Sequence, residues 1–220
     1  MIAKASQHEQ GSYEWLVDRI GYTSSSNIAA IMAKGSGATR ANYMARMICE
    51  VLTGVPVQTF KSSAMNAGNE REPLSRALYE RITGNVVGEV GFHFIESEHH
   101  GSSSDGLVND NGLVEIKNVI PAEQIRLLAS GKRNDAGVIE YKIKTEYIKQ
   151  MQDQMYVYER DWCDFVQTSF GDEELGTLPA QHRIKIIRVE RDEQMIAEIR
   201  REVAKFHDDM KILIDKLREL

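Results

Sequence analysis

The chain has 220 residues, a formal net charge of −6 and a composition of 42% hydrophobic and 27% charged residues. This size predicts one large domain, or one domain with extensions, that can bury a sizeable core. The acidic balance argues against a passive nucleic-acid coat protein, which is usually basic. It does not exclude an enzyme with a local basic track beside an acidic metal site.

The first half of the chain is expected to be helical. Ser12 can cap a short helix that runs to Arg19 and ends at Gly21. The serines at 24–26 can cap a second helix over 27–33, which leads into a Gly/Ser/basic loop over 34–40. Longer helices are expected over about 41–53 and 65–82, with Pro73 near the first turns of the latter.

The second half is expected to hold the sheet. Strands are predicted over 85–95, 102–108, 113–118, 163–169 and 183–189, helices over 121–131 and 145–158, and a flexible basic loop over 132–138. This order indicates an α/β or α+β fold with a mostly antiparallel sheet.

Apolar residues at three- and four-residue steps predict a C-terminal helix. We expect it to pack on the chain's own sheet, with an oligomer seam as the alternative. The residues of this stripe are Ile196, Ile199, Val203, Phe206, Met210, Leu213, Leu217 and Leu220.

Targeting, cofactor and soft-metal signals are scarce. Cys49 and Cys163 are the only cysteines, which excludes a four-cysteine zinc site or iron–sulfur cluster within the chain and suits a reducing cytoplasm. The histidines lack metal-ligand spacing, and no P-loop, G-x-G-x-x-G or G-x-S-x-G motif occurs. No apolar run is long enough to span a membrane, and residues 1–11 lack a signal-peptide core, so we expect a cytoplasmic protein without membrane association.

The most informative motif is Ser104-Asp105-Gly106, followed ten residues after the aspartate by Glu115-Ile116-Lys117. The turn sequence Asn-Asp-Asn-Gly over 109–112 predicts a hairpin between them. Strand side chains alternate, so Glu115 and Lys117 share one face. Asp105 joins that face if the connection has three or five residues or if Gly106 forms a bulge; an even-length loop puts it on the other face.

These residue types suit a Mg2+-dependent nuclease. Carboxylates are hard ligands for Mg2+, and the Ile116 carbonyl would add a third oxygen. Lys117 would orient or deprotonate the attacking water and offset charge on the phosphate. The alternative is that Asp105 is an ordinary turn residue and that Glu115 and Lys117 lie on a solvated strand face.

Further polar residues could serve the same site. Glu72 would lie on a helix just before the sheet, and Gln150 and Gln154 share a helix face at i, i+4. A glutamine there would bind water or phosphate without adding charge. Taken alone, however, a glutamate or glutamine on a helix is more often part of an ordinary solvated face, and this is the alternative for all three residues.

A phosphate site is indicated near the N-terminus. Arg19 offers a cation, and Ser24 and Ser26 offer hydroxyls beside helix N-terminal amides, although serine caps do the same with no ligand. Loop cations that could meet a phosphate backbone, or simply be solvated, are Lys34, Arg40, Lys132 and Arg133.

Taken in order, these motifs resemble the family of lambda exonuclease (Red alpha) and YqaJ-type viral recombinases, within the PD-(D/E)xK nuclease superfamily. The similarity runs nearly end to end, and its co-occurring pieces are more specific than any one of them. The pieces are Trp15-x3-Arg19-x-Gly21, Thr23-Ser24-x-Ser26, Glu50-Val51-Leu52-Thr53-Gly54-Val55, Gly68-x3-Glu72, Ser103-Ser104-Asp105-Gly106, Glu115-Ile116-Lys117, Tyr147-x2-Gln150-x-Gln152 and Val189-Glu190-Arg191-Asp192-Glu193.

The resemblance implies a restriction-endonuclease-like core, in which a mixed central sheet is flanked by helices. It implies one nuclease domain over 1–220, with a helical part carrying the 5′-phosphate site over 1–60, a catalytic core over 61–190 and a C-terminal helix over 191–220. Asp105, Glu115 and the Ile116 carbonyl would bind two Mg2+ ions, which Mn2+ could replace. Lys117 would be the catalytic lysine, and Glu72 and Gln150 would help to place water.

The resemblance also assigns the DNA end. Arg19, Ser26 and Ser103 match residues that hold the 5′-phosphate, and Met65 matches an apolar wedge that splits the terminal base pairs. Two positions depart from the family pattern. The usual proline before the catalytic aspartate is Ser104, and a family arginine in the loop after the second helix is replaced by Ser36, so Lys34 or Arg40 would have to substitute.

The implied activity is 5′-to-3′ digestion of one strand of duplex DNA to 5′-mononucleotides, by in-line hydrolysis with two Mg2+ ions sharing Asp105. The implied partners are double-stranded DNA ends, two further copies in a ring trimer, and a single-strand annealing protein that loads onto the 3′ tail. The implied location is the cytoplasm of a bacterial host, encoded by the host or a prophage. The alternatives are an endonuclease on the same core and a non-catalytic DNA-end-binding protein whose acidic cluster is structural.

Overall fold

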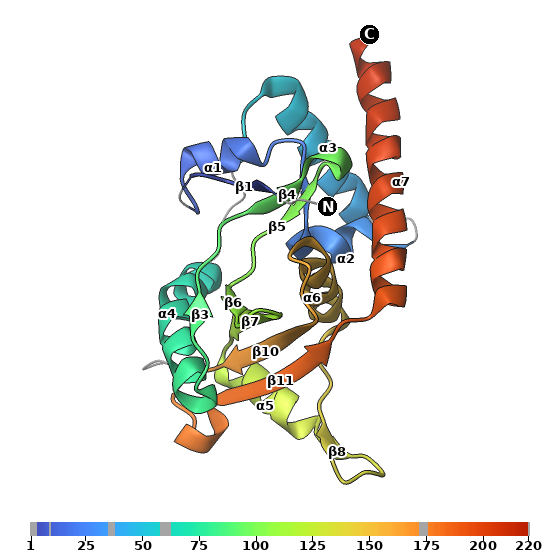
Figure 1. The fold of residues 1–220 in the computed structure, drawn as a ribbon. Coiled ribbons are helices and arrows are strands. Elements are labelled where there is room, and N and C mark those ends of the chain that lie inside the picture. The colour runs from blue at the N-terminus through green and yellow to red at the C-terminus, as the bar shows by residue number, and fades with distance from the viewer. Residues whose placement is uncertain (1–3, 9, 35–37, 58–62, 172–175, 220) are drawn as a thin grey trace.

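Two sheets with helices packed around them form the core of the computed structural model (Figure 1), which describes residues 4–8, 10–34, 38–57, 63–171 and 176–219, excepting the side chains of 63–69. The larger sheet has the strand order β11-β10-β7-β6-β3; only β7 and β10 in it are parallel. Its strands are β3 (Val87–Gly88), β6 (Gly106–Val108), β7 (Gly112–Asn118), β10 (Trp162–Thr168) and β11 (Ile184–Glu190).

A smaller sheet has the order β1-β4-β5-β2. Its strands are β1 (Lys4–Ala5), β2 (Thr23–Ser24), β4 (His93–Ile95) and β5 (His100–Ser102). The expected single strand over 85–95 is therefore wrong, because β3 and β4 belong to different sheets. The alternation that suggested it arises because Val87 is buried beside β6 and β7, while Phe92 is buried against the ring of Trp15.

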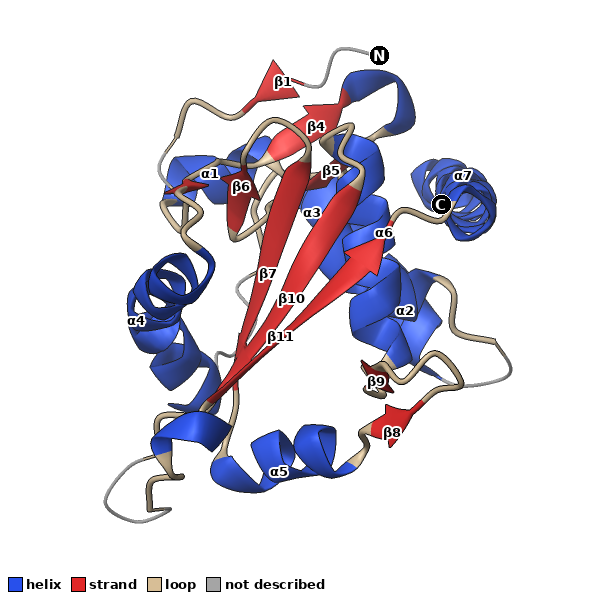
Figure 2. Cartoon of the chain, turned by 60° about the horizontal axis from the view of Figure 1, so that its bottom comes forward, coloured by secondary structure: helices blue, strands red, loops and turns tan. Residues whose placement is uncertain are grey.

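Helices cover both faces of the larger sheet (Figure 2). On one face, α4 (Ser63–Thr83) packs Tyr79 against Val114 of β7. On the other, α6 (Thr145–Val157) packs Met151 against Leu113, and α5 (Pro121–Ala129) joins the same cluster. This α–β–α layering confirms the predicted mixed sheet flanked by helices. Side chains alternate along β7, so Glu115 lies on the same face as Leu113 and points toward α6.

The C-terminal helix α7 (Glu193–Arg218) is confirmed, but it packs on helices rather than on its own sheet. Its buried side chains form one cluster with α2 (Ile28–Ile31) and α3 (Ala38–Thr53). Leu213 and Leu217 are 42% and 46% exposed, whereas Ile214 is buried. A straight helix has 3.6 residues per turn, so a 3.5-residue stripe drifts off the buried face over several turns.

The shorter elements complete the fold. Ser12 caps α1 (Tyr13–Asp18) as predicted, its hydroxyl accepting from Trp15 N at 3.1 Å. The expected basic loop over 132–138 is instead a ribbon of β8 (Lys132–Arg133) and β9 (Ile139–Glu140), closed by Asn134. The single turns of 3-10 helix are η1 (Ser25–Asn27), η2 (Glu96–Glu98) and η3 (Ala180–His182).

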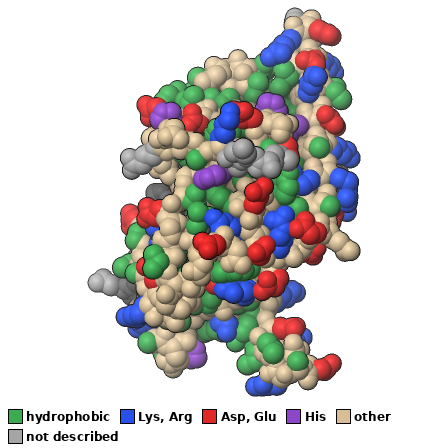
Figure 3. All heavy atoms as spheres, viewed as in Figure 1, with side chains coloured by type: hydrophobic (Ala, Val, Ile, Leu, Met, Phe, Trp, Pro, Cys, Tyr) green, Lys and Arg blue, Asp and Glu red, His purple; other side chains and the backbone are tan. Residues whose placement is uncertain are grey.

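Acidic and basic side chains are interspersed along α7 in the space-filling view (Figure 3). Within the described residues, no helix is both long enough and apolar enough to cross a lipid bilayer.

Candidate active site

The β6–β7 hairpin brings the three residues of the predicted nuclease motif together. Its register pairs Gly106 with Val114 and Val108 with Gly112, which leaves a three-residue connection over 109–111. Because the connection has an odd number of residues, Asp105 lies on the same face of the hairpin as Glu115, as sequence analysis predicted for a three-residue connection. The Asp105 carboxylate accepts a hydrogen bond from Ile116 N at 2.6 Å, which ties the end of β6 to β7.

Glu115 is the centre of the site. It is only 1% exposed, so the alternative of a solvated strand face is wrong. Its Oε1 accepts from Gln150 Nε2 at 2.7 Å, and its Oε2 accepts from Gln154 Nε2 at 2.6 Å. Lys117 donates to the same Oε1. Sequence analysis placed Gln154 on the helix face of Gln150, but the family resemblance assigned a role to Gln150 only.

Acidic side chains outnumber basic ones among the interacting residues of the site. Burial raises the pKa of Asp105 well above its ordinary value, and Glu115 and Glu72 raise it further. Burial likewise raises the pKa of Glu72, against the opposing effect of Arg76, which donates to it at 2.9 Å. Burial opposes a charged Lys117, but Glu115 and Asp105 outweigh it and raise the lysine pKa.

This donor set fits Mg2+. Asp105 interacts electrostatically with Glu115, Glu72 and Lys117, and Arg76 pairs with both Glu72 and Glu89. A divalent cation would offset the excess charge that raises the Asp105 pKa. The N–H and C=O of a strand residue point to the same side, so the Ile116 carbonyl faces the side of Asp105. Among the described side chains, no group of three or more His, Cys, Asp or Glu lies close enough together to hold a metal ion by itself.

A cavity of about 590 Å³ opens onto this site. Glu72, Arg76 and Asp105 line it together with His8 of the N-terminal segment. The segment before Asp105 is fixed by the Tyr158 hydroxyl, which bonds to Ser102 O at 2.9 Å and accepts from Ser104 N at 3.2 Å. Ser104 stands where the family usually has a proline. Hydrogen bonds to Tyr158 therefore fix the backbone here, where a proline ring would otherwise restrict it.

A second cavity, of about 530 Å³, contains the predicted phosphate residues Arg19, Ser24 and Ser26. The Arg19 guanidinium lies over the rings of Trp15 at 4.1 Å and Phe92 at 4.8 Å. Burial lowers its pKa, which reflects a cation with little water around it. A partly desolvated arginine beside the hydroxyl groups of Ser24 and Ser26 is suited to an anion such as phosphate.

Sequence analysis missed two residues of this cavity. Arg46 of α3 lines it together with Arg19, and Asn27 donates to Ser24 Oγ at 2.9 Å and to Ser26 Oγ at 3.3 Å. Arg46 lies three residues after Tyr43, with its guanidinium 5.0 Å from that ring. The i, i+3 spacing of an aromatic and an arginine was the available signal.

Comparison with known proteins identifies the family of the chain. The family model of the YqaJ-like viral recombinase domain matches residues 14–161 of the chain. This range includes Arg19 of the second cavity and Asp105 and Glu115 of the acidic site. The chain belongs to the YqaJ-like viral recombinase family. The alkaline exonuclease LHK-Exo of Laribacter hongkongensis is 38% identical, covers 94% of this chain and 97% of its own, and superposes with a TM-score of 0.80.

Other relatives extend the comparison. LHK-Exo in complex with dAMP is 39% identical over the same coverage, with a TM-score of 0.79. A phage-related exonuclease of Haemophilus somnus shares the fold at 17% identity, with a TM-score of 0.69 over 89% of this chain and 96% of its own. Uncharacterized protein R354 of Acanthamoeba polyphaga mimivirus is 28% identical over 182 residues; the match covers 78% of this chain and 31% of that protein.

Some residues of the family motifs serve the fold. Gln152 binds Glu190 O at 2.7 Å and Asp192 N at 2.8 Å, away from Glu115. Asp192 caps α7, and Arg191 donates to Met155 O at 2.6 Å. These contacts fix the turn between β11 and α7.

Four predicted DNA contacts have other positions or stay untested. Arg40 lies in α3 rather than in a loop and pairs with Asp209 of α7 at 2.7 Å. Lys34 is exposed. Ser103 follows β5, and its carbonyl accepts from Gln154 at 3.3 Å; it does not line the Arg19 cavity. Met65 lies in α4, but its side chain and residue 36 fall outside the described part of the chain.

Proposed function

We propose that this protein is a Mg2+-dependent exonuclease that digests one strand of double-stranded DNA from the 5′ end. Family membership and the relation to LHK-Exo support a DNA exonuclease. The observation that carries the finer proposal is the pairing of a carboxylate–lysine site with a separate arginine–serine cavity. A nuclease that cuts within a strand has no use for a pocket that fits a terminal phosphate.

Asp105, Glu115 and the Ile116 carbonyl would hold two Mg2+ ions, or Mn2+ in their place. Mg2+ there would lower the pKa of water and stabilise negative charge on the scissile phosphate. Lys117 would orient the attacking water and donate to a phosphate oxygen. Gln150 and Gln154 hold the Glu115 carboxylate in one orientation, which keeps its ligand geometry fixed.

Arg19, Ser24, Ser26, Arg46 and Asn27 would receive the 5′-phosphate of the end through charge-assisted hydrogen bonds. Each cut creates a new 5′-phosphate, and rebinding it would advance the duplex by one nucleotide. The product would be a 5′-mononucleotide, the chemical class of the dAMP bound by LHK-Exo.

The assembly belongs to the same proposal. We infer a ring trimer around the duplex, a single-strand annealing protein that receives the 3′ tail, and action in the cytoplasm. Val138 and Ile139 of the β8–β9 ribbon are 58% and 46% exposed beside the edge strand β11, which is an apolar surface suited to another copy.

A linear duplex labelled at one 5′ end or at one 3′ end tests polarity and metal dependence. With Mg2+, we expect rapid release of the 5′ label as mononucleotide and retention of the 3′ label in long strands. EDTA should abolish release of the 5′ label, because without a metal ion the carboxylates of the site repel the negatively charged phosphate. A nicked and a closed circular plasmid serve as controls.

Cuts within the closed circle would replace the proposal with an endonuclease. DNA-end binding without hydrolysis under any divalent metal would support the non-catalytic alternative.

Arg19→Gln should reduce kcat/KM on a 5′-phosphorylated duplex by about 10- to 100-fold, since a charge-assisted contact to phosphate contributes about 1.5–3 kcal/mol. The loss on a 5′-hydroxyl duplex should be several-fold at most. Arg126→Gln is the matched control, since Arg126 is an exposed arginine on α5. An equal loss on both ends would exclude a role in phosphate recognition.

A further inference from the structure

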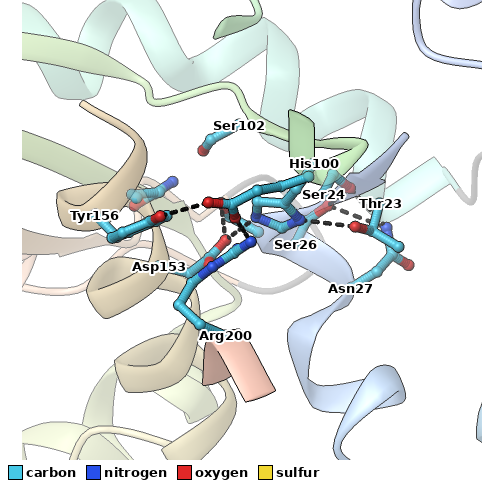
Figure 4. A network of polar contacts seen from close by, with 12 residues as sticks. Thr23, Ser24, Ser26, Asn27, His100, Ser102, Asp153, Tyr156 and Arg200 are labelled. Carbon is cyan, nitrogen blue, oxygen red and sulfur yellow. Dashed lines mark hydrogen bonds and ion pairs between the residues drawn. The ribbon is translucent and has the colours of Figure 1, made fainter. Parts of the chain in front are cut away.

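One buried carboxylate lies between the serines of the phosphate cavity and the helix that contacts Glu115. Asp153 of α6 is 0% exposed, and its Oδ2 accepts from Ser25 Oγ at 2.6 Å. The same oxygen lies 2.6 Å from His100 Nε2. Arg200 of α7 approaches Oδ1 at 3.6 Å. Figure 4 shows Asp153 between His100 and Arg200, so segments far apart in the sequence meet at one side chain.

The histidine extends this connection to β2. His100 Nδ1 lies 2.7 Å from Thr23 Oγ1, and both residues are 0% exposed. Both ring nitrogens of His100 therefore have a partner, Asp153 at Nε2 and Thr23 at Nδ1, and Thr23 Oγ1 also lies 3.1 Å from His207 Nε2. The pairing of β2 with β5 in parallel register, Thr23 beside His100, fixes the same contact through the backbone.

The order Thr, His, Asp is also that of a nucleophilic triad, but burial excludes this chemistry. Thr23, Ser25, His100 and Asp153 are each at most 2% exposed, and none lines either cavity described above. No substrate atom can reach the hydroxyl. The group therefore acts through the segments that it holds.

Those segments are the functional ones. Ser25 stands between Ser24 and Ser26, which line the phosphate cavity. Gln154, the residue after Asp153, donates to Glu115 at 2.6 Å. Successive residues of one helix thus hold the phosphate cavity and the central carboxylate of the catalytic site. A helix turn is stiff, so a shift at one contact is passed to the other.

We propose that Asp153, supported by His100, is a positioning residue that sets the spacing between the 5′-phosphate pocket and the Glu115 site. The inference rests on the proposed function. Binding of the end phosphate then places the scissile bond at Glu115 and Lys117, so cleavage depends on the phosphate. Misplacing a bound group by about 1 Å can cost about 100-fold in rate, so even a small shift of the phosphate pocket on loss of the Ser25–Asp153 bond should be measurable.

Ser25→Ala tests the proposal with the smallest change, since it deletes one hydroxyl that touches no DNA. Steady-state kcat and KM are measured on linear duplexes with a 5′-phosphate and with a 5′-hydroxyl. We expect the preference for the phosphorylated end to fall at least about tenfold, with the loss on the phosphorylated substrate only. Asp153→Asn should give a larger loss, and the double variant no more than Asp153→Asn alone, because both act through one bond.

Tyr79→Phe is the matched control. It also deletes a hydroxyl that donates to a buried carboxylate, Asp164, at 2.7 Å, but it lies away from both cavities. It should lower the melting temperature as Ser25→Ala does and leave the end preference unchanged. A folded Ser25→Ala protein with the wild-type preference, or with equal loss on both ends, would overturn the inference alone. Absence of any 5′-phosphate preference in the wild type would instead refute the proposed end recognition, and this inference with it.

Discussion

Lys117→Ala is expected to lower kcat by about 1,000-fold while DNA-end binding persists. The ammonium group contacts Glu115 and lies 5.3 Å from the Tyr147 ring, at the edge of the acidic cluster. Removal leaves the cluster without its only lysine and leaves the attacking water and the phosphate without a positioned donor. Loss of one acid–base or electrostatic group costs about 100- to 10,000-fold, so the expected value lies inside this range.

The measurement is single-turnover release of 5′ label with Mg2+, with end binding followed by fluorescence anisotropy in Ca2+. Lys205→Ala is the control, because Lys205 is an exposed lysine on α7 that lines neither of the two cavities. It should keep wild-type rates. If Lys117→Ala hydrolysed DNA within tenfold of wild type, the lysine would have no role in the chemistry.

The local part of the site follows from sequence because it depends on short-range rules. Strand alternation puts Glu115 and Lys117 on one face, and the turn sequence predicts the hairpin. The position of Asp105 was conditional on loop length, since one residue more or less would turn it to the opposite face. The three-residue connection satisfied that condition.

The rest of the site depends on contacts between distant segments, which periodicity does not report. Gln154 and Gln150 share a helix face, but only the packing of α6 on β7 brings both to Glu115. Asp153 has the pattern of a solvated helical acid, yet it is buried against Ser25, which is 128 residues away. Arg40 was expected in a loop, but α3 begins at Ala38 and gives it a partner on α7.

In the fold, too, local elements could be predicted from the sequence, whereas contacts between distant segments could not. Each long helix was predicted from the sequence, but none of the predictions identified the correct packing partner. The α7 stripe indicated one buried face correctly as far as Met210, but no local signal distinguished a sheet from the helices α2 and α3 as its support. Similarly, the alternation over 85–95 could not reveal that the chain leaves one sheet for another between β3 and β4.

Asp105→Asn should abolish hydrolysis and yet stabilise the metal-free protein. Burial and the neighbouring Glu115 and Glu72 raise the pKa of Asp105 above its ordinary value of 3.8, so its ionised form opposes folding. An asparagine keeps the shape and removes the charge. A single stabilising substitution commonly raises the free energy of unfolding by about 0.5–2 kcal/mol. We expect the free energy of unfolding of Asp105→Asn to exceed that of the wild type by an amount in this range at pH 8 in EDTA.

The pH dependence of this gain has a definite sign. With a raised folded-state pKa, the favourable contribution of a protonated Asp105 is present at acidic pH and is lost as the pH rises through that pKa. The variant should therefore gain over wild type as the pH rises, and the difference should vanish in acid. Urea unfolding across this range with EDTA measures it, and Ser104→Ala controls for disturbance of the same turn.

Mg2+ should reverse the order of stability at pH 8. A ligand that binds only the folded state stabilises it in proportion to its occupancy, and the wild type retains both carboxylates while the variant retains one. We expect the wild-type melting temperature to rise with Mg2+ and that of Asp105→Asn to change little. Equal metal stabilisation of both proteins would show that Asp105 is not a ligand. A variant that is less stable than wild type in EDTA would show that its carboxylate stabilises the hairpin through Ile116 N more than its charge opposes folding.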